Sequence, residues 1–83
     1  MATVDVHLWA GLRRLTDGED VVTVEASTIG EMLDAVTKRY PGLGPILESG
    51  VSVALNGEIY NGSRHRAVET GDEVFLMQKI KGG

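Results

Sequence analysis

The chain of 83 residues contains no cysteine. It can therefore form no disulfide, has no thiolate nucleophile and cannot build a zinc–thiolate site. It also has no apolar run approaching the roughly 18 residues that a membrane span needs. Residues 1–5 show neither the basic start nor the apolar stretch of a signal peptide. These absences predict a cytoplasmic protein without a membrane partner.

An excess of positive charge is lacking as well. The formal net charge is -4, whereas a domain that binds nucleic acid is expected to present a basic face to the phosphates. The composition therefore predicts that nucleic acid is not a partner.

The usual catalytic motifs are also missing. We find no nucleophile elbow, no zinc-protease helix and no phosphate-binding loop. His7 and His65 lack the spacing of metal ligands, which favours surface or structural roles and predicts no metal site. Arg64 and Arg66 flank His65 and could contact an anion, although a short basic loop is usually just solvated. We expect the chain to bind no cofactor of its own.

What the chain does have is the composition of a folded domain. Hydrophobic residues make up 42% of it, which argues against disorder. A chain of this length holds one modest core, so we expect a single domain over residues 1–83.

Two strands are predicted in the first third of the chain. Residues 4–9 alternate, which places Val4 and Val6 on one face and His7 and Trp9 on the other. A β-branched run over 21–25 resumes the strand signal, and the two segments are expected to pair as a hairpin with a long loop.

A helix of about three turns is predicted next. Thr28 and Glu31 have the spacing of a capping box. The apolar residues that follow recur at spacings of three and four and form one stripe: Ile29, Met32, Leu33, Val36 and Tyr40. Tyr40 precedes Pro41 and is the expected end of the helix. Residues 42–45 are interpreted as a loop.

The remaining residues predict three more strands, at 51–55, at 58–60 and from about 73 to 80, separated by turn signals. The dense apolar stretch of the last strand favours the middle of the sheet. This order of elements predicts an α+β fold of the β-grasp (ubiquitin-like) class. It would have a mixed sheet of four to five strands, with the first and last adjacent and parallel, and one main helix on one face. The expected core consists of the apolar stripe of the helix together with Val4, Val6, Val22, Val53 and Leu76.

The last strand also offers a candidate contact surface. Its alternation points Phe75 and Met77 away from the face that the helix covers. They form either an exposed docking patch or apolar filler beside Trp9, and the sequence leaves both readings open.

Gly82 and Gly83 end the chain shortly after this apolar strand. We expect residues 79–83 to form a flexible tail, in which Lys81 and Gly82 would thread a partner's active site because glycine adopts conformations closed to other residues. The Gly83 carboxylate is ionised at neutral pH and is a poor electrophile until a partner enzyme activates it. It is the candidate reactive group, in an acyl transfer.

These features resemble the ThiS/MoaD sulfur-carrier family. The resemblance rests on the turn and strand start at 70–74, the terminal Gly82-Gly83, and the first strand with its arginine-containing exit at 7–13. In length, the chain is more similar to the molybdopterin synthase small subunit than to the thiamine carrier.

The resemblance implies that a ubiquitin-activating-like adenylyltransferase uses ATP to adenylate Gly83. Sulfur from sulfide or a persulfide would then give a thiocarboxylate, which donates sulfur to an acceptor such as the large subunit of a synthase. Molybdopterin biosynthesis is favoured over thiamine biosynthesis. Gly83 would be a co-substrate, so the chain alone would not be an enzyme. By position, Met77 corresponds to an apolar site that contacts the partner proteins, and Phe75 is its neighbour.

Two other functions are compatible with the sequence. A ubiquitin-like modifier would attach Gly83 to a lysine of another protein, and it would begin with the same adenylation. A noncovalent β-grasp binding module would use its surface alone, with no reaction at the glycines.

Overall fold

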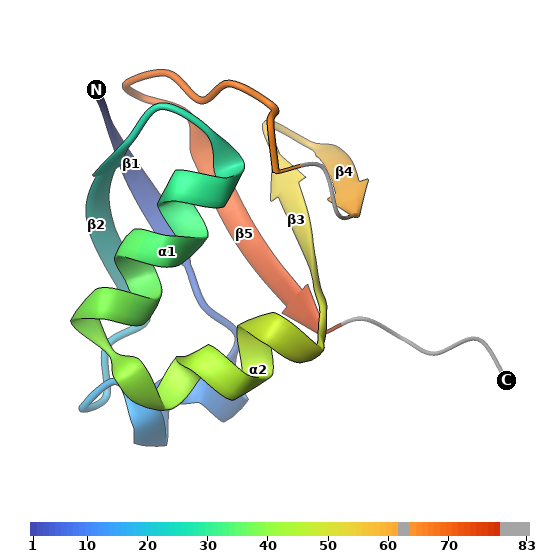
Figure 1. Ribbon diagram of the computed structural model, residues 1–83. Helices are drawn as coiled ribbons and strands as arrows, with labels where there is room; N and C mark the ends of the chain where they lie inside the picture. Colours follow the sequence, from blue (N-terminus) through green and yellow to red (C-terminus); the bar gives the residue numbers. More distant parts are fainter. Residues whose placement is uncertain (62–63, 79–83) are drawn as a thin grey trace, which may run out of the picture.

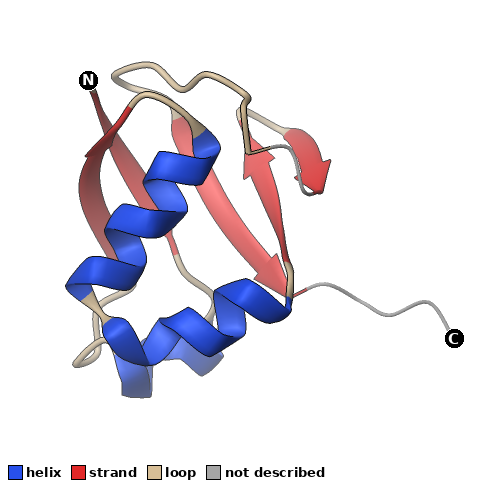
Figure 2. Cartoon of the chain, in the orientation of Figure 1, coloured by secondary structure: helices blue, strands red, loops and turns tan. Residues whose placement is uncertain are grey.

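The computed structural model describes residues 1–61 and 64–78. In this part, helices cover one face of a five-stranded sheet (Figures 1 and 2). The strands are β1 (Ala2–His7), β2 (Val21–Ala26), β3 (Val51–Leu55), β4 (Glu58–Asn61) and β5 (Glu73–Gln78). The helical segments are the 3-10 helices η1 (Ala10–Leu15) and η2 (Pro41–Leu43) and the α-helices α1 (Ile29–Arg39) and α2 (Gly44–Ser49).

The strand order is β2-β1-β5-β3-β4. β1 and β5 run parallel, with Val6 beside Val74, whereas the other neighbouring pairs are antiparallel. The predicted β-grasp fold is therefore confirmed, including the adjacent first and last strands and the central place of β5. None of the helices in the described part of the chain is long and apolar enough to cross a membrane.

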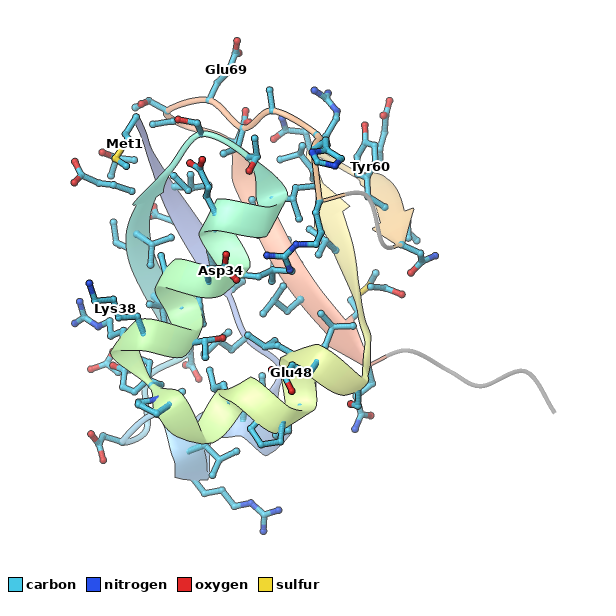
Figure 3. All side chains as sticks on the ribbon, in the orientation of Figure 1. Met1, Asp34, Lys38, Glu48, Tyr60 and Glu69 are labelled. Atoms are coloured by element: carbon cyan, nitrogen blue, oxygen red, sulfur yellow. The ribbon has the colours of Figure 1, made fainter. Side chains whose placement is uncertain are left out.

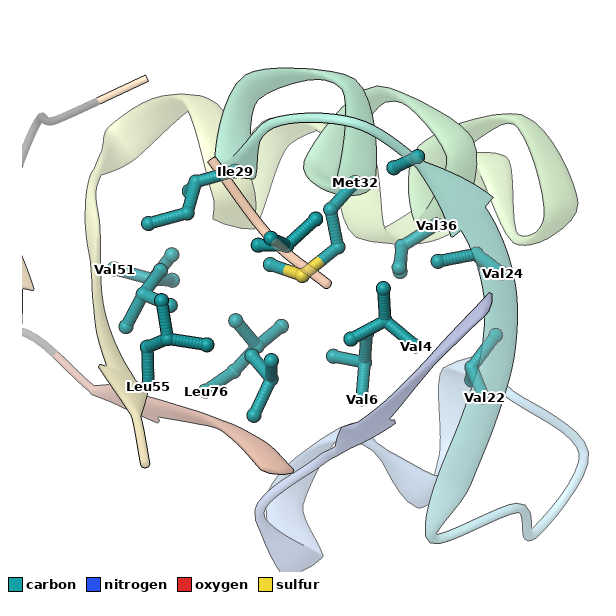
Figure 4. Close-up of a cluster of buried hydrophobic side chains, with 14 of the residues drawn as sticks. Val4, Val6, Val22, Val24, Ile29, Met32, Val36, Val51, Leu55 and Leu76 are labelled. Atoms are coloured by element: carbon teal, nitrogen blue, oxygen red, sulfur yellow. The ribbon is translucent and has the colours of Figure 1, made fainter. Parts of the chain in front are cut away.

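The core lies between the sheet and α1 (Figure 4). Met32 and Val36 of α1 are fully buried, as are Val4 and Val6 of β1. The five strand residues expected in the core are buried, as are Ile29, Met32 and Val36 of the expected helix stripe, whereas Leu33 and Tyr40 are only partly buried. The apolar side chains that recur every second residue in the strands and every three to four residues in α1 therefore pack together in one layer.

The start of α1 is capped by its own side chains. Thr28 Oγ1 accepts a hydrogen bond from the Glu31 amide at 3.2 Å, and the Glu31 carboxylate accepts one from the Ser27 amide at 2.9 Å. These are the two bonds of a capping box, with the second bond one residue earlier than in the usual form. α1 ends at Arg39, and Tyr40 is its C-cap.

Two predictions about the ends of elements were wrong. Residues 42–45, expected to be a loop, belong to η2 and α2. Pro45 lies in the first turn of α2, where a missing amide hydrogen costs nothing because that group has no partner within the helix. The first strand does not extend to Trp9: β1 ends at His7, the Leu8 amide makes one more bond to the Asp20 carbonyl, and Trp9 precedes η1 and packs against the core.

Candidate functional site

The residues expected to react and to thread a partner lie outside the described residues: Lys81, Gly82 and Gly83, together with the rest of 79–83. β5 is the last described element and ends at Gln78, beside Val51 at the start of β3. The surface of the sheet that carries β5 is therefore the part of the candidate site that the structure describes.

β5 presents its side chains alternately to the core and to the open face of the sheet, which is the face opposite the helices. Val74 and Leu76 are buried, whereas Phe75 is 43% exposed and Met77 is partly buried. The orientation predicted for Phe75 and Met77 is thus observed. Their docking role remains a prediction.

The neighbour of Phe75 differs from the expected one. The imidazole of His7 stacks on the Phe75 ring, with ring centroids 4.3 Å apart and an angle of 15° between the planes. Trp9 had been the candidate neighbour, but β1 ends at His7, so Trp9 leaves the sheet. The stack presents a partly exposed aromatic surface at the centre of the sheet.

This stack is the middle of a row that crosses the whole open face. Successive register partners on the five strands form it: Val21, His7, Phe75, Ala54 and Ile59. Val21 is 38% exposed and Ile59 is 61% exposed. Besides Met1, all the exposed large apolar residues of the described part belong to this row. We call it the cross-strand row.

Sequence reasoning missed Val21 and Ile59 as surface residues of this row. The alternation within each strand showed which side chains share a face, but not how the strands are aligned. Alignment depends on the parallel pairing of β1 with β5, which residues far apart in the sequence create.

The basic loop that contains Arg64 and Arg66 forms hydrogen bonds to α1 and β4. Arg64 Nη2 bonds to Asp34 Oδ1 at 2.9 Å and to the Gly30 carbonyl at 3.2 Å. Arg66 lies over the Tyr60 ring and donates from Nε to its hydroxyl at 3.0 Å, which raises the pKa of Arg66. Both guanidinium groups have protein partners, which favours a structural role over the anion contact.

The helical side carries a shallow cavity of about 110 Å³ between α1 and α2. Asp34 and Glu48 lie on the helices that border it (Figure 3). No group of three or more potential metal ligands occurs within residues 1–61 and 64–78.

A family model described as the ThiS family matches residues 6–83. The chain belongs to the ThiS family. The match includes β5, the Phe75 and Met77 positions and the two terminal glycines.

Solved structures of similar proteins agree with this placement in the ThiS family. The chain is 27% identical to the small archaeal modifier protein 1 of Haloferax volcanii, with a TM-score of 0.79 over 99% of this chain and 100% of that one. It is 27% identical to a chain of the Amycolatopsis orientalis BexX/CysO complex, with a TM-score of 0.81 over 96% of this chain and 99% of that one.

A more distant likeness shows the shared fold alone. The chain is 22% identical to a chain in the complex of subunits 1 and 2 of the molybdopterin-converting factor from Helicobacter pylori, with a TM-score of 0.68 over 98% of this chain and 99% of that one. A search among curated proteins gave no match. The β-grasp body is thus shared by chains that differ from this one at most positions.

Proposed function

We propose that this ThiS family protein is a sulfur carrier whose reacting group is the carboxylate of Gly83, as the carboxyl-terminal residue of the mature protein. The observation that carries the proposal is the family match, which extends through Gly83. The described body supports it because β5 ends five residues before Gly83. Five extended residues span about 16–18 Å, enough to enter a partner's active site while the sheet docks outside it.

The chemistry is an acyl transfer in two steps. An adenylyltransferase of the ubiquitin-activating type binds ATP, and a carboxylate oxygen of Gly83 attacks the α-phosphorus and releases pyrophosphate. Hydrosulfide then attacks the acyl carbon and displaces AMP, leaving a thiocarboxylate and a proton. If the donor is a persulfide, an acyl disulfide forms first and a second thiol cleaves it. The carrier supplies the acyl group, and the partner enzyme supplies catalysis and nucleotide binding, in the cytoplasm.

Docking of the body uses the open face, through Phe75 and Met77. Partly exposed apolar side chains next to the end of β5 give a partner an apolar contact close to the point where the reacting tail begins. Burial of this contact would position the tail without a further recognition element.

The decisive experiment measures the intact mass of the protein after incubation with the adenylyltransferase, ATP and sulfide. Conversion replaces one carboxylate oxygen by sulfur, so the mass of the protein rises by the difference between these two atoms. A chain lacking Gly83 and a chain with its terminus blocked as an amide are the controls, and both should remain unchanged. An unshifted mass for the unmodified protein with every adenylyltransferase of the source organism would refute the proposal.

The favoured acceptor is the large subunit of molybdopterin synthase rather than the thiazole synthase of thiamine biosynthesis, because the chain has the length of the molybdopterin-branch carrier. The purified thiocarboxylate should lose its sulfur to the precursor bound by that large subunit. Transfer of sulfur only to the thiazole synthase, in a parallel reaction, would instead make thiamine biosynthesis the favoured pathway.

A second candidate function is protein modification through Gly83, which the 27% identity to a small archaeal modifier protein favours. Affinity-tagged protein expressed in its own cell would then appear in covalent adducts of high mass. Absence of such adducts, with the thiocarboxylate present, would leave the carrier function alone.

A further inference from the structure

On the strands that the structure describes, the open face carries charge of one sign. Among the described strand residues that point to this face, three are carboxylates and none is lysine or arginine: Asp5, Glu25 and Glu73. The described basic residues lie instead on helices or loops: Arg13, Arg14, Lys38, Arg39, Arg64 and Arg66.

Two of the carboxylates are neighbours. Asp5 of β1 and Glu73 of β5 are register partners in the parallel pair, both are exposed, and they stand next to His7 and Phe75. Within the described residues, neither forms an ion pair, and Asp5 accepts a hydrogen bond from Thr23 Oγ1 at 2.8 Å. Like charges opposite each other on adjacent strands destabilise a sheet. A basic group placed between them would remove that repulsion.

We propose that the β2–β1–β5 half of the open face is the specificity surface for the adenylating enzyme, and that it selects a partner patch with an apolar centre bordered by arginine or lysine. The His7–Phe75 stack contacts the apolar centre, and Asp5 and Glu73 pair with the basic border. The inference rests on the proposed function. It adds contact roles for His7, Asp5 and Glu73 and the prediction that the partner's surface is positively charged around its apolar centre.

The test is noncovalent binding of the purified adenylating enzyme, measured by calorimetry without ATP at low and high salt. The double variant Asp5→Lys/Glu73→Lys is compared with Glu19→Lys/Glu48→Lys, whose reversed charges lie on the loop before β2 and on α2. Both double variants change the net charge of -4 by the same amount. Long-range electrostatic attraction to the enzyme is therefore altered equally in the two. We expect about a tenfold loss of affinity for the first double at low salt and little change for the second. The loss should shrink at high salt because ions screen the pairs.

Variants of the stack test the apolar centre. His7→Phe keeps a ring on Phe75 and should keep binding, whereas His7→Ala and Phe75→Ala should weaken it about tenfold or more, as expected for an aromatic contact residue. Thermal unfolding of each variant establishes that the protein is folded. Equal losses for both charge doubles, or unchanged binding by Phe75→Ala, would overturn the inference.

The outcome is separable from that of the proposed function. If the unmodified protein gains sulfur but the Asp5, Glu73, His7 and Phe75 variants bind normally, the carrier function stands and the specificity surface is wrong. If the unmodified protein binds the enzyme through this surface without gaining sulfur, the surface stands and the carrier function fails.

Discussion

The side chains of Asn56 and Asp72 join the turn between β3 and β4 to the turn that precedes β5. Asn56 Nδ2 donates to Asp72 Oδ1 at 3.0 Å, and Asn56 Oδ1 accepts from the Glu73 amide at 3.0 Å. The other Asp72 oxygen accepts from the Glu69 amide at 2.7 Å. Gly71, with φ of 92°, supplies the conformation that other residues avoid. This network fixes the start of the strand that carries Phe75.

Replacement of Asp72 by Asn should make the protein less stable at neutral pH but not in acid. Hydrogen bonds from Asn56 and Glu69 lower the pKa of Asp72 below its ordinary value, against an opposing effect of burial. The carboxylate therefore stabilises the fold fully above its pKa in the unfolded chain, and this contribution is lost as pH falls through the lower pKa of the folded state. We expect a difference of about 0.5–1 kcal/mol at pH 7, discounted for the partial exposure of the site.

Urea denaturation of the Asp72→Asn variant between pH 7 and pH 2 measures this difference. Asp17→Asn is the control, because the Asp17 side chain makes none of the hydrogen bonds found among the described residues. A difference between Asp72→Asn and the unmodified protein that stays constant down to pH 2 would show that the carboxylate's charge is not its source.

Thr16 should be required for the shape of the loop between η1 and β2. Its side chain is fully buried, and its hydroxyl donates to the Glu19 carbonyl at 2.9 Å. Thr16→Val keeps the volume but leaves that carbonyl without its donor, at a cost of about 1–2 kcal/mol. Hydrogen exchange should quicken at the amides of Gly18 and Glu19, which donate to the carbonyls of Arg13 and Thr16. Thr16→Ser retains the hydroxyl and should exchange at the rate of the unmodified protein, so equally fast exchange in both variants would contradict the role assigned to the hydroxyl.

The sequence was sufficient to predict β3 and the place of β5 because these segments carry consistent local signals. β3 matches its predicted range, and the turn at Asn56 and Gly57 has positive φ at both residues, as this dipeptide favours. The capping pair Thr28 and Glu31 likewise set the start of α1.

The features that were missed depend on contacts between distant segments. α2 has six residues and begins with glycine and proline, so local propensity alone does not predict it. It forms where η2 and α1 pack against it. The stacking of His7 on Phe75 required the parallel alignment of β1 with β5, which hydrophobic alternation does not specify.

Met32 should be a major contributor to stability. It is fully buried at the centre of the face that α1 presents to the sheet (Figure 4). Met32→Ala should lower the free energy of unfolding by about 2–5 kcal/mol, a large share of the 5–15 kcal/mol typical of whole domains. Met32→Leu, of similar volume, should cost less than about 1.5 kcal/mol. Equal losses in guanidinium denaturation would mean that the cavity is not the cause.

Glu73→Gln should stabilise the isolated protein, because it removes the repulsion between the carboxylates of Glu73 and Asp5 on adjacent strands. The expected gain is about 0.2–1 kcal/mol at low ionic strength, and it should fade in 1 M salt, where the screening length is about 3 Å. Denaturation of the single variants Glu73→Gln and Asp5→Asn and of the double variant gives the coupling between the two sites. The hydrogen bond from Thr23 that Asp5→Asn perturbs cancels in this cycle. A gain of the same size in the Asp5→Asn background would show that the two carboxylates do not interact. The repulsion from which the basic border of the partner's patch was inferred would then be absent.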